Sequence, residues 1–320
     1  MTLNEFLTEW NNDSDRLLVH TSGSTGKPKP LWVEKRRMLS SARITCRFLG
    51  LQPDDTALLC MPLDYIAGKM MVVRALYCGL RLITVEPSGH PLKGLDTPLT
   101  FAAMVPLQVY NSLQVPEERE RLMQIRHLII GGGAIDEALE RELQDFPNAV
   151  WSTYGMTETL SHVALRRLNG PQRSNWYTPL SSVSVALSPE GCLIVNAPEV
   201  CDEPVVTNDI AELAPDGSFR ILGRKDNVIC SGGIKIQIEE VERVLRPHLA
   251  QPFLISKRPD PKFGEAVVLL TEGDTLEAQT VCRQVLPRHW CPRHYLHVDR
   301  IPLTATGKPA RAEAQSICEA

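Results

Sequence analysis

The chain has 320 residues, enough for about two domains, and a hydrophobic fraction of 43% that predicts a globular protein with a sizeable core. A formal net charge of -4 provides no basic surface for nucleic acid, and the lack of any run of about 18 uncharged apolar residues excludes a transmembrane helix. The N-terminus lacks the features of a signal peptide and the nine cysteines include no C-x-x-C motif, so we expect a cytoplasmic protein with reduced thiols.

The first half of the chain alternates short apolar runs with helical patterns. Strands are predicted at 15–20, 56–63, 80–86, 99–105 and 125–131, and helices at 33–50, 67–79, 106–113 and 136–146. Gly50 and Gly79 are expected to end the first two helices. The alternation predicts an α/β fold in which helices are layered on a mixed, largely parallel sheet.

The pattern changes after Gly155. A hairpin is predicted at 182–196, short strands at 217–224 and 227–236, and an amphipathic helix from Ile238 to the residue before Pro247. The remaining tail has two predicted strands, a helix and a final strand, at 251–258, 265–272, 276–286 and 295–302. We therefore expect a large domain over residues 1–225 and a small α+β domain over residues 226–320, joined by a hinge.

The stretch "HTSGSTGKPKP" (His20–Pro30) has the composition of an anion-binding loop. Its glycines let the backbone approach a ligand, its hydroxyl side chains donate hydrogen bonds and its lysines add positive charge. It is not the common loop G-x-x-x-x-G-K-[ST], because His20 stands at the first glycine position and Pro28 at the last position. The candidate phosphate ligands are Thr21, Ser22, Gly23, Ser24, Thr25, Gly26 and Lys27.

"TSGSTGKPK" resembles the phosphate loop of the adenylate-forming superfamily, which contains acyl-CoA synthetases, luciferases and peptide-synthetase adenylation domains. Other motifs of that family follow in the expected order. "LIIGGGAI" (128–135) is similar to the strand end beside adenine, which implies nucleotide contacts for Gly132, Gly133 and Ala134. "YGMTET" (154–159) is similar to the turn whose aromatic ring stacks on adenine, whose threonine meets the α-phosphate and whose glutamate holds Mg²⁺. Those roles fall on Tyr154, Gly155, Thr157 and Glu158.

Three further motifs lie closer to the C-terminus. "TNDIAEL" resembles the segment whose carboxylate, here Asp209, binds both ribose hydroxyls; Asn208 replaces the usual glycine, and because Asn tolerates a positive φ the turn is expected to survive. "ILGRKDNVICSGG" resembles the hinge segment, which implies a ribose contact for Arg224, the pivot for Asp226 and a CoA channel along Ser231, Gly232 and Gly233. "TGK" in "IPLTATGKPAR" implies that Lys308 is the catalytic lysine.

The resemblance implies two half-reactions that use ATP, Mg²⁺ and CoA. A carboxylate first attacks the α-phosphorus of ATP to give acyl-AMP and pyrophosphate, and a thiol, usually that of CoA, then displaces AMP. Full-length members place a large part of their first subdomain before the phosphate loop, whereas about twenty residues precede it here, which predicts an N-terminally shortened large domain. A homodimer, or a separate chain that supplies the missing subdomain, stays open.

The segment "MPLDYIAGKMMVVRALYCGLRLITVEP" (61–87) resembles the o-succinylbenzoate–CoA ligases of menaquinone biosynthesis. Their acid has a second, aromatic carboxylate that is not activated and needs a counter-charge. Lys69, just after Gly68, is the expected counter-charge and Arg74 the alternative, with Ser161 near the acid and His162 behind it. A ligase for another aryl or fatty acid, an enzyme that loads a carrier protein, and a non-catalytic nucleotide-binding relic are the other interpretations. The last is disfavoured because all the motifs are retained.

Overall fold

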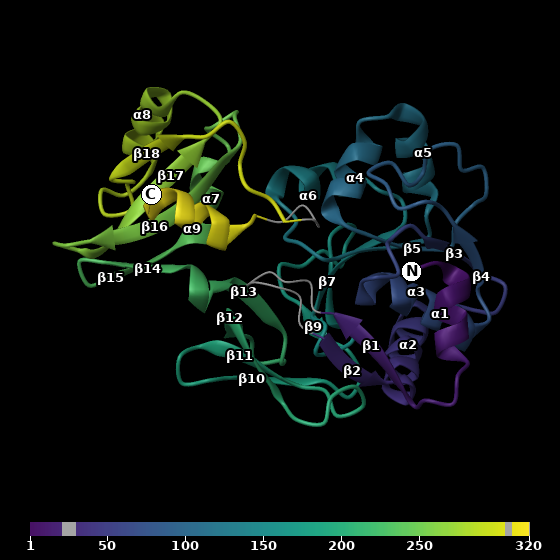
Figure 1. Cartoon of the computed structure of the whole chain (residues 1–320). Coiled ribbons are helices and arrows are strands. Elements are labelled where there is room, and N and C mark those ends of the chain that lie inside the picture. The colour runs from purple at the N-terminus through teal and green to yellow at the C-terminus, as the bar shows by residue number, and fades with distance from the viewer. Residues whose placement is uncertain (21–29, 305–308, 320) are drawn as a thin grey trace.

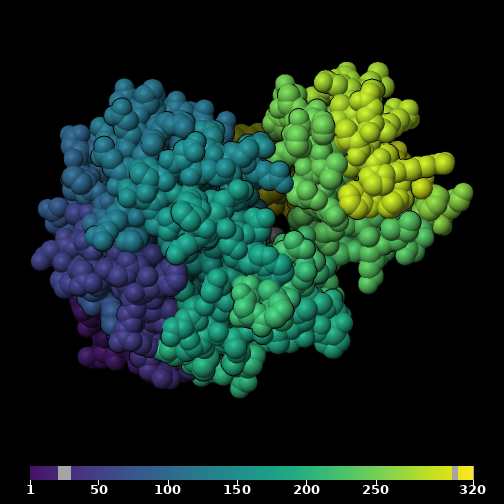
Figure 2. Space-filling view, turned by 180° about the vertical axis from the view of Figure 1, so that it is seen from behind, coloured from purple at the N-terminus to yellow at the C-terminus, as the bar shows by residue number. Residues whose placement is uncertain are grey.

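The computed structural model describes residues 1–20, 30–304 and 309–319. The chain forms a larger body at its N-terminal side and a smaller one at its C-terminal side (Figure 1). The view from behind shows the two bodies meeting over a limited contact, with a hollow between them (Figure 2). We call them the large lobe (up to Arg224) and the small lobe (from Lys225).

The large lobe is organised by a seven-stranded sheet in the order β4-β3-β5-β6-β7-β8-β9. Its strands are β3 Thr56–Leu59, β4 Arg81–Thr84, β5 Phe101–Met104, β6 His127–Ile130, β7 Ala149–Gly155, β8 His162–Arg167 and β9 Thr178–Pro179. Neighbours from β4 to β7 are parallel, and β8 and β9 continue the sheet antiparallel. The predicted mixed, largely parallel sheet is therefore confirmed.

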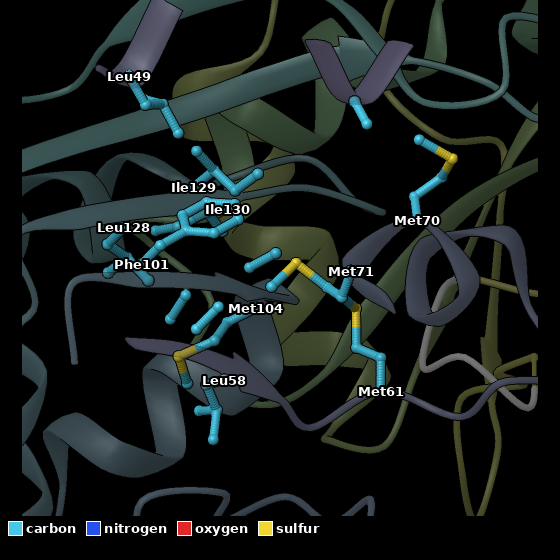
Figure 3. Close-up of a cluster of buried hydrophobic side chains, with 14 of the residues drawn as sticks. Leu49, Leu58, Met61, Met70, Met71, Phe101, Met104, Leu128, Ile129 and Ile130 are labelled. Carbon is cyan, nitrogen blue, oxygen red and sulfur yellow. The ribbon is translucent and has the colours of Figure 1, made fainter. Parts of the chain in front are cut away.

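Helices alternate with the strands of this lobe, as the sequence pattern predicts. They are α2 Lys35–Leu49, α3 Ile66–Cys78, α4 Pro106–Leu113, α5 Pro116–Gln124 and α6 Glu137–Leu143, after α1 Leu3–Trp10 at the N-terminus. Gly50 and Gly79 end α2 and α3 in the left-handed conformation, as expected. Figure 3 shows how methionines of α3 pack with aliphatic and aromatic side chains of β3, β5 and β6 to form the core of this lobe.

Two smaller sheets complete the large lobe. Strands β1 Arg16–His20 and β2 Pro30–Glu34 pair antiparallel on either side of residues 21–29. Strands β10 Ser184–Leu187, β11 Cys192–Asn196, β12 Val205–Leu213 and β13 Phe219–Arg224 form an antiparallel sheet in chain order. The β10–β11 pair is the hairpin predicted at 182–196.

The small lobe begins at a 3₁₀ turn, Lys225–Asn227, and has its own sheet. It contains β14 Val228–Ser231, β15 Ile234–Gln237, β16 Phe253–Asp260, β17 Gly264–Thr271 and β18 His294–His297, with α7 Ile238–Leu245, α8 Thr275–Val285 and α9 Arg311–Glu319. β17 and β18 are parallel and α8 connects them, as the predicted tail pattern requires. The buried apolar residues of this lobe form clusters separate from the large-lobe core.

The differences from the predicted elements are local. The strand expected at 56–63 ends at Leu59, because the chain turns away before the helix that starts at Ile66. Helices α1, α5 and α9 were not predicted. Each spans eight or nine residues and buries one or two side chains, so no apolar period marks it in the sequence.

Candidate active site

The site lies where two parallel strands of the central sheet end. β6 is followed by Gly132, Gly133 and Ala134, and its neighbour β7 ends in Tyr154 and Gly155. Because parallel strands end at one edge of a sheet, the two motifs lie side by side. The carboxyl edge of such a sheet is where α/β proteins usually bind ligands.

Gly155 is required by a close approach of the chain to itself. A Cβ atom at Gly155 would lie 2.2 Å from the carbonyl oxygen of Ser161, so no larger residue fits without moving the turn. The turn is completed by Leu160, which has a φ of 64° although it is not glycine. The turn after β7 thus brings Ser161 back beside the end of that strand.

Three residues far apart in the sequence meet at Asp209. The Tyr154 hydroxyl donates to Asp209 Oδ2 at 2.6 Å, and Arg224 Nη1 donates to Asp209 Oδ1 at 3.0 Å. The Tyr154 ring packs edge-on against Phe219, with 5.1 Å between ring centroids, and burial together with the Asp209 charge raises the pKa of Tyr154. The structure thus brings together the aromatic, ribose and arginine positions predicted from three motifs.

Thr157 and Glu158 lie in the turn after β7. The Thr157 side chain is buried, whereas that of Glu158 is exposed. The backbone carbonyl of Glu158 accepts a hydrogen bond from Cys201 Sγ at 3.2 Å. The Glu158 carboxylate forms no ion pair with any of the described residues.

Asp226 connects this cluster to the start of the small lobe. Arg224 Nη2 donates to Asp226 Oδ2 at 3.0 Å, so one guanidinium bridges Asp209 and Asp226. Asn208 Nδ2 lies 3.0 Å and 3.3 Å from the two Asp226 oxygens. The positive φ expected at Asn208 is wrong, because Asn208 is an extended residue inside β12 and its side chain binds Asp226 instead.

A second cluster surrounds Arg74 on α3. The Arg74 side chain is only 2% exposed, and its Nη2 donates to Ser161 Oγ at 2.5 Å. Within the described part of the chain, Nη1 donates to the sulfur of Met71 at 3.7 Å and Nε has no hydrogen-bond partner. Burial lowers the pKa of Arg74 to about 10. No carboxylate of the described residues pairs with this guanidinium.

Lys69 lies on the same helix but contacts other residues. Its Nζ is 5.5 Å from the Phe6 ring centroid and 3.3 Å from Met1 Sδ, both in the N-terminal segment. Burial lowers the pKa of Lys69. Gly68 packs against the backbone of Pro62. Of the two cations predicted on this helix, Arg74 is the one that contacts Ser161.

The remaining predicted positions lie elsewhere. Gly232 and Gly233, with φ of 59° and 81°, form the exposed tip of the β14–β15 hairpin, where a two-residue turn requires positive φ at both positions. This hairpin extends away from the large lobe (Figure 1). Residues Thr21–Lys27 and Lys308 lie outside the described residues.

Sequence reasoning missed Thr45, whose Oγ1 lies 3.0 Å from His162 Nε2. A signal for it exists in α2, where Ser41 and Thr45 stand four residues apart on the buried face of the helix. Polar side chains at core positions of an amphipathic helix indicate a buried hydrogen-bond network.

The comparisons with known proteins decide the family. A family model described as AMP-binding enzyme matches residues 6–203. The chain belongs to the AMP-binding enzyme family. A 2-succinylbenzoate–CoA ligase from Bacillus thuringiensis subsp. konkukian (strain 97-27) is 26% identical over 337 aligned residues, which cover 94% of this chain and 70% of that ligase.

Solved structures support the same family. An acyl-CoA synthetase (AMP-forming)/AMP-acid ligase II-like protein from Dyadobacter fermentans DSM 18053 is 32% identical and covers 97% of this chain and 91% of its own, with a TM-score of 0.66. The o-succinylbenzoate coenzyme A synthetase from Bacillus subtilis, in complex with ATP and magnesium ion, shares the fold at 24% identity and a TM-score of 0.77, over 92% of this chain and 69% of its own. This AMP-binding family member is therefore an AMP-forming acyl-CoA synthetase or ligase. No helix in the described part of the chain has the length and apolar character to cross a membrane.

Proposed function

We propose that the chain converts an aryl dicarboxylic acid, o-succinylbenzoate, to its CoA thioester through an acyl-AMP intermediate, as a cytoplasmic step of menaquinone biosynthesis. The observation that carries this choice of acid is Arg74, a buried guanidinium with no carboxylate partner among the described residues. Similarity to 2-succinylbenzoate–CoA ligases at 26% identity supports the same choice.

A buried cation without a counter-ion is costly, because a low-dielectric interior stabilises a charge much less than water does. A ligand that brings the opposite charge would offset this cost. Among the residues that the structure describes, Arg74 has no partner for its Nε, and its strongest contact is to a neutral hydroxyl, that of Ser161. The second carboxylate of the acid would bind this guanidinium through charge-assisted hydrogen bonds. Lys69 is the weaker candidate, because its ammonium contacts the N-terminal segment.

The Asp209 cluster suits a ribose. Each carboxylate oxygen of Asp209 accepts one hydrogen bond, from Tyr154 or from Arg224, and can exchange that donor for a ribose hydroxyl. The aromatic ring of Tyr154 offers a face for adenine, and the loop of Gly132, Gly133 and Ala134 would lie along the base. We assign ATP binding to these residues.

Glu158 and Thr157 fit a magnesium ion that accompanies ATP. A carboxylate that is exposed and forms no ion pair with described residues is the hard oxygen ligand that Mg²⁺ prefers. Glu158 would hold the ion, and the Thr157 hydroxyl would contact the α-phosphate. When bound, Mg²⁺ offsets negative charge on the phosphate oxygens.

In the first half-reaction the acid's carboxylate oxygen bonds to the α-phosphorus while the bond from that phosphorus to the pyrophosphate oxygen breaks. Lys308 would pair with the reacting oxygens, and the segment from Thr21 to Lys27 would hold the departing pyrophosphate; both lie outside the described residues. In the second, the CoA sulfur bonds to the acyl carbon, AMP leaves and the thiol proton passes to solvent. Catalysis then rests on positioning and electrostatics rather than on a covalent enzyme nucleophile.

We further propose that residues 1–225 and 226–320 are separate domains that move about Asp226 between the half-reactions. Separate apolar clusters in the two lobes support this division. The tip Ser231–Gly233 would then contact CoA only after the small domain has turned, since its hairpin extends away from the large lobe here (Figure 1).

The test is ATP–pyrophosphate exchange over a panel of acids. The decisive pair is o-succinylbenzoate and 4-oxo-4-phenylbutanoate, which is the same acid without its ring carboxylate. Exchange with o-succinylbenzoate and weak exchange with the control acid support the proposal. Exchange with other aryl or fatty acids indicates a different ligase, and CoA-independent transfer to a carrier-protein thiol indicates a carrier-loading enzyme. ATP binding without exchange for any acid identifies a non-catalytic relic.

A further inference from the structure

A series of hydrogen-bonded polar side chains connects α3, the turn after β7, and α2. Arg74 Nη2 lies 2.5 Å from Ser161 Oγ, which lies 3.3 Å from His162 Nδ1. On the other side of the ring, His162 Nε2 lies 3.0 Å from Thr45 Oγ1. Thr45 Oγ1 in turn donates to the backbone carbonyl of Ser41 at 3.2 Å. Thr45 is fully buried and His162 is 8% exposed, so water does not replace these bonds.

One arrangement of protons satisfies every heavy-atom contact in this series of side chains. A threonine hydroxyl has one hydrogen, and that of Thr45 goes to the Ser41 carbonyl; Thr45 therefore accepts from His162, whose hydrogen is on Nε2. A guanidinium only donates, so Ser161 Oγ accepts from Arg74 and gives its own hydrogen to His162 Nδ1. In this arrangement His162 is neutral and carries its hydrogen on Nε2.

The surroundings of His162 agree with an uncharged ring. Burial is the main cause that lowers the pKa of His162 well below its ordinary value, and the neighbouring Arg74 charge lowers it further. The series from Arg74 through Ser161 and His162 to Thr45 therefore carries a single positive charge, that of Arg74.

We propose that Thr45 and His162 are positioning residues that make this site selective for an acid with a second carboxylate. They direct the Ser161 hydrogen toward the His162 ring, so that the Ser161 oxygen is left as a fixed acceptor that holds Arg74 in place. The guanidinium then meets the substrate carboxylate in one orientation. This inference rests on the proposed function, because it needs Arg74 to receive that carboxylate.

The test compares Thr45→Val, which has the same shape but no hydrogen-bond acceptor, with Thr45→Ser, which keeps the acceptor. Thr45→Ala, which removes the acceptor with a smaller side chain, is measured in parallel. The first readout is the histidine tautomer, observed by NMR on protein with ¹⁵N-labelled histidine, and the His162 signals are assigned by their loss in His162→Gln. In Thr45→Val and Thr45→Ala the ring is expected to move its hydrogen to Nδ1, because Nε2–H would otherwise be buried without a partner. Thr45→Ser is expected to keep the Nε2–H form.

The second readout is the KM for o-succinylbenzoate and for 4-oxo-4-phenylbutanoate. In Thr45→Val the Ser161 oxygen would accept from both Nδ1–H and Arg74 and hold the guanidinium less tightly. We expect the KM for o-succinylbenzoate to rise about fivefold, the equivalent of one weakened hydrogen bond, while the KM for the control acid and for ATP changes less than about twofold. Thr45→Ser should stay near the unsubstituted protein.

Two outcomes would overturn the inference. One is an unchanged tautomer in both Thr45→Val and Thr45→Ala. The other is an equal rise of KM for the two acids, which a purely structural role would produce. Failure of the proposed function would give a different result, because o-succinylbenzoate would then support no exchange in the unsubstituted protein. The NMR readout needs no substrate, so it would still test the contact between Thr45 and His162.

Discussion

The two arginines of the candidate site are held in opposite ways. Arg224, at the junction of the lobes, is 35% exposed on its side chain and bridges two carboxylates, those of Asp209 and Asp226. Arg74, beneath the turn after β7, is 2% exposed and contacts a serine and a methionine. The protein neutralises the Arg224 charge, and water screens it. Arg74 has no carboxylate partner among the described residues and little contact with water.

This difference indicates what each region binds. Charged groups that pair within the protein and are partly exposed to water can exchange their partners at little cost in free energy. This property suits a site that binds neutral ribose hydroxyls, and it suits a junction that moves. A buried cation without a carboxylate partner attracts a negatively charged group and rejects a neutral one. We therefore expect substitutions at Arg74 to change the choice of acid, and substitutions near Arg224 to change nucleotide binding and the junction of the lobes.

The largest effect is expected for Arg74→Leu. Loss of two charge-assisted hydrogen bonds should raise the KM for o-succinylbenzoate about 100-fold or more, with little change for 4-oxo-4-phenylbutanoate. The free energy of unfolding should stay the same or increase, because an uncompensated buried charge is removed. Exchange kinetics and urea unfolding measure the two quantities.

Arg220→Leu is the matched control, since Arg220 is an exposed arginine that pairs with Glu212. It should leave the KM of both acids unchanged. An equal change of the KM for the two acids in Arg74→Leu would contradict the assignment of Arg74 to the second carboxylate.

The next largest effect is expected for Asp209→Asn. The amide keeps the shape of Asp209 but offers one acceptor oxygen in place of two, so the KM for ATP should rise about 10- to 50-fold. The KM for the acid should stay within about twofold, because the hydrogen bonds that Asp209 makes with described residues involve Tyr154 and Arg224 and not the Arg74 cluster. The control is Glu212→Gln on the same strand, which removes a carboxylate that pairs with the exposed Arg220. Equal effects of both variants would show that Asp209 has no specific part in ATP binding.

The sequence predicts much of the Arg224 region and less of the Arg74 region, for a physical reason. Tyr154, Asp209 and Arg224 stand in motifs whose order implies a common site, and the structure brings them together. The choice between Lys69 and Arg74 depends on helix rotation and on α1, a short helix that covers Lys69 and was not predicted. Thr45 was missed because its partner His162 is 117 residues away in the chain. Buried contacts between distant segments do not appear as a period or a motif.

A smaller effect is expected on the pH dependence of stability, through His162. Its pKa in the folded protein is well below the ordinary value of 6.5, so the unfolded chain binds a proton first as the pH falls. The contribution of His162 to stability is therefore complete above about pH 6.5 and decreases below it, by up to about 1.4 kcal/mol per pH unit. His162→Gln should remove this part of the slope, as measured by urea unfolding between about pH 5 and pH 7.5. The exposed His289, changed to Gln, is the control, and identical slopes in the two variants would refute the prediction.

The smallest effect is expected for Asn208→Ala at the junction of the lobes. The variant removes both hydrogen bonds from the Asn208 amide to Asp226, but Arg224 still holds that carboxylate. Because Asp226 is partly exposed, we expect the free energy of local opening at the junction to fall by about 1 kcal/mol. Tryptic cleavage after Arg224 and Lys225 should then be about fivefold faster.

Asn196→Ala is the control for this variant, since Asn196 lies on the neighbouring strand β11 and its side-chain amide donates to the Ser184 hydroxyl, away from Asp226. Its cleavage rate should match that of the unsubstituted protein. Equal rates in all three proteins would mean that Arg224 alone secures Asp226. A faster rate in Asn208→Ala alone would establish that this asparagine, which stands where the family has glycine, restrains the junction that the Arg224 region is proposed to move.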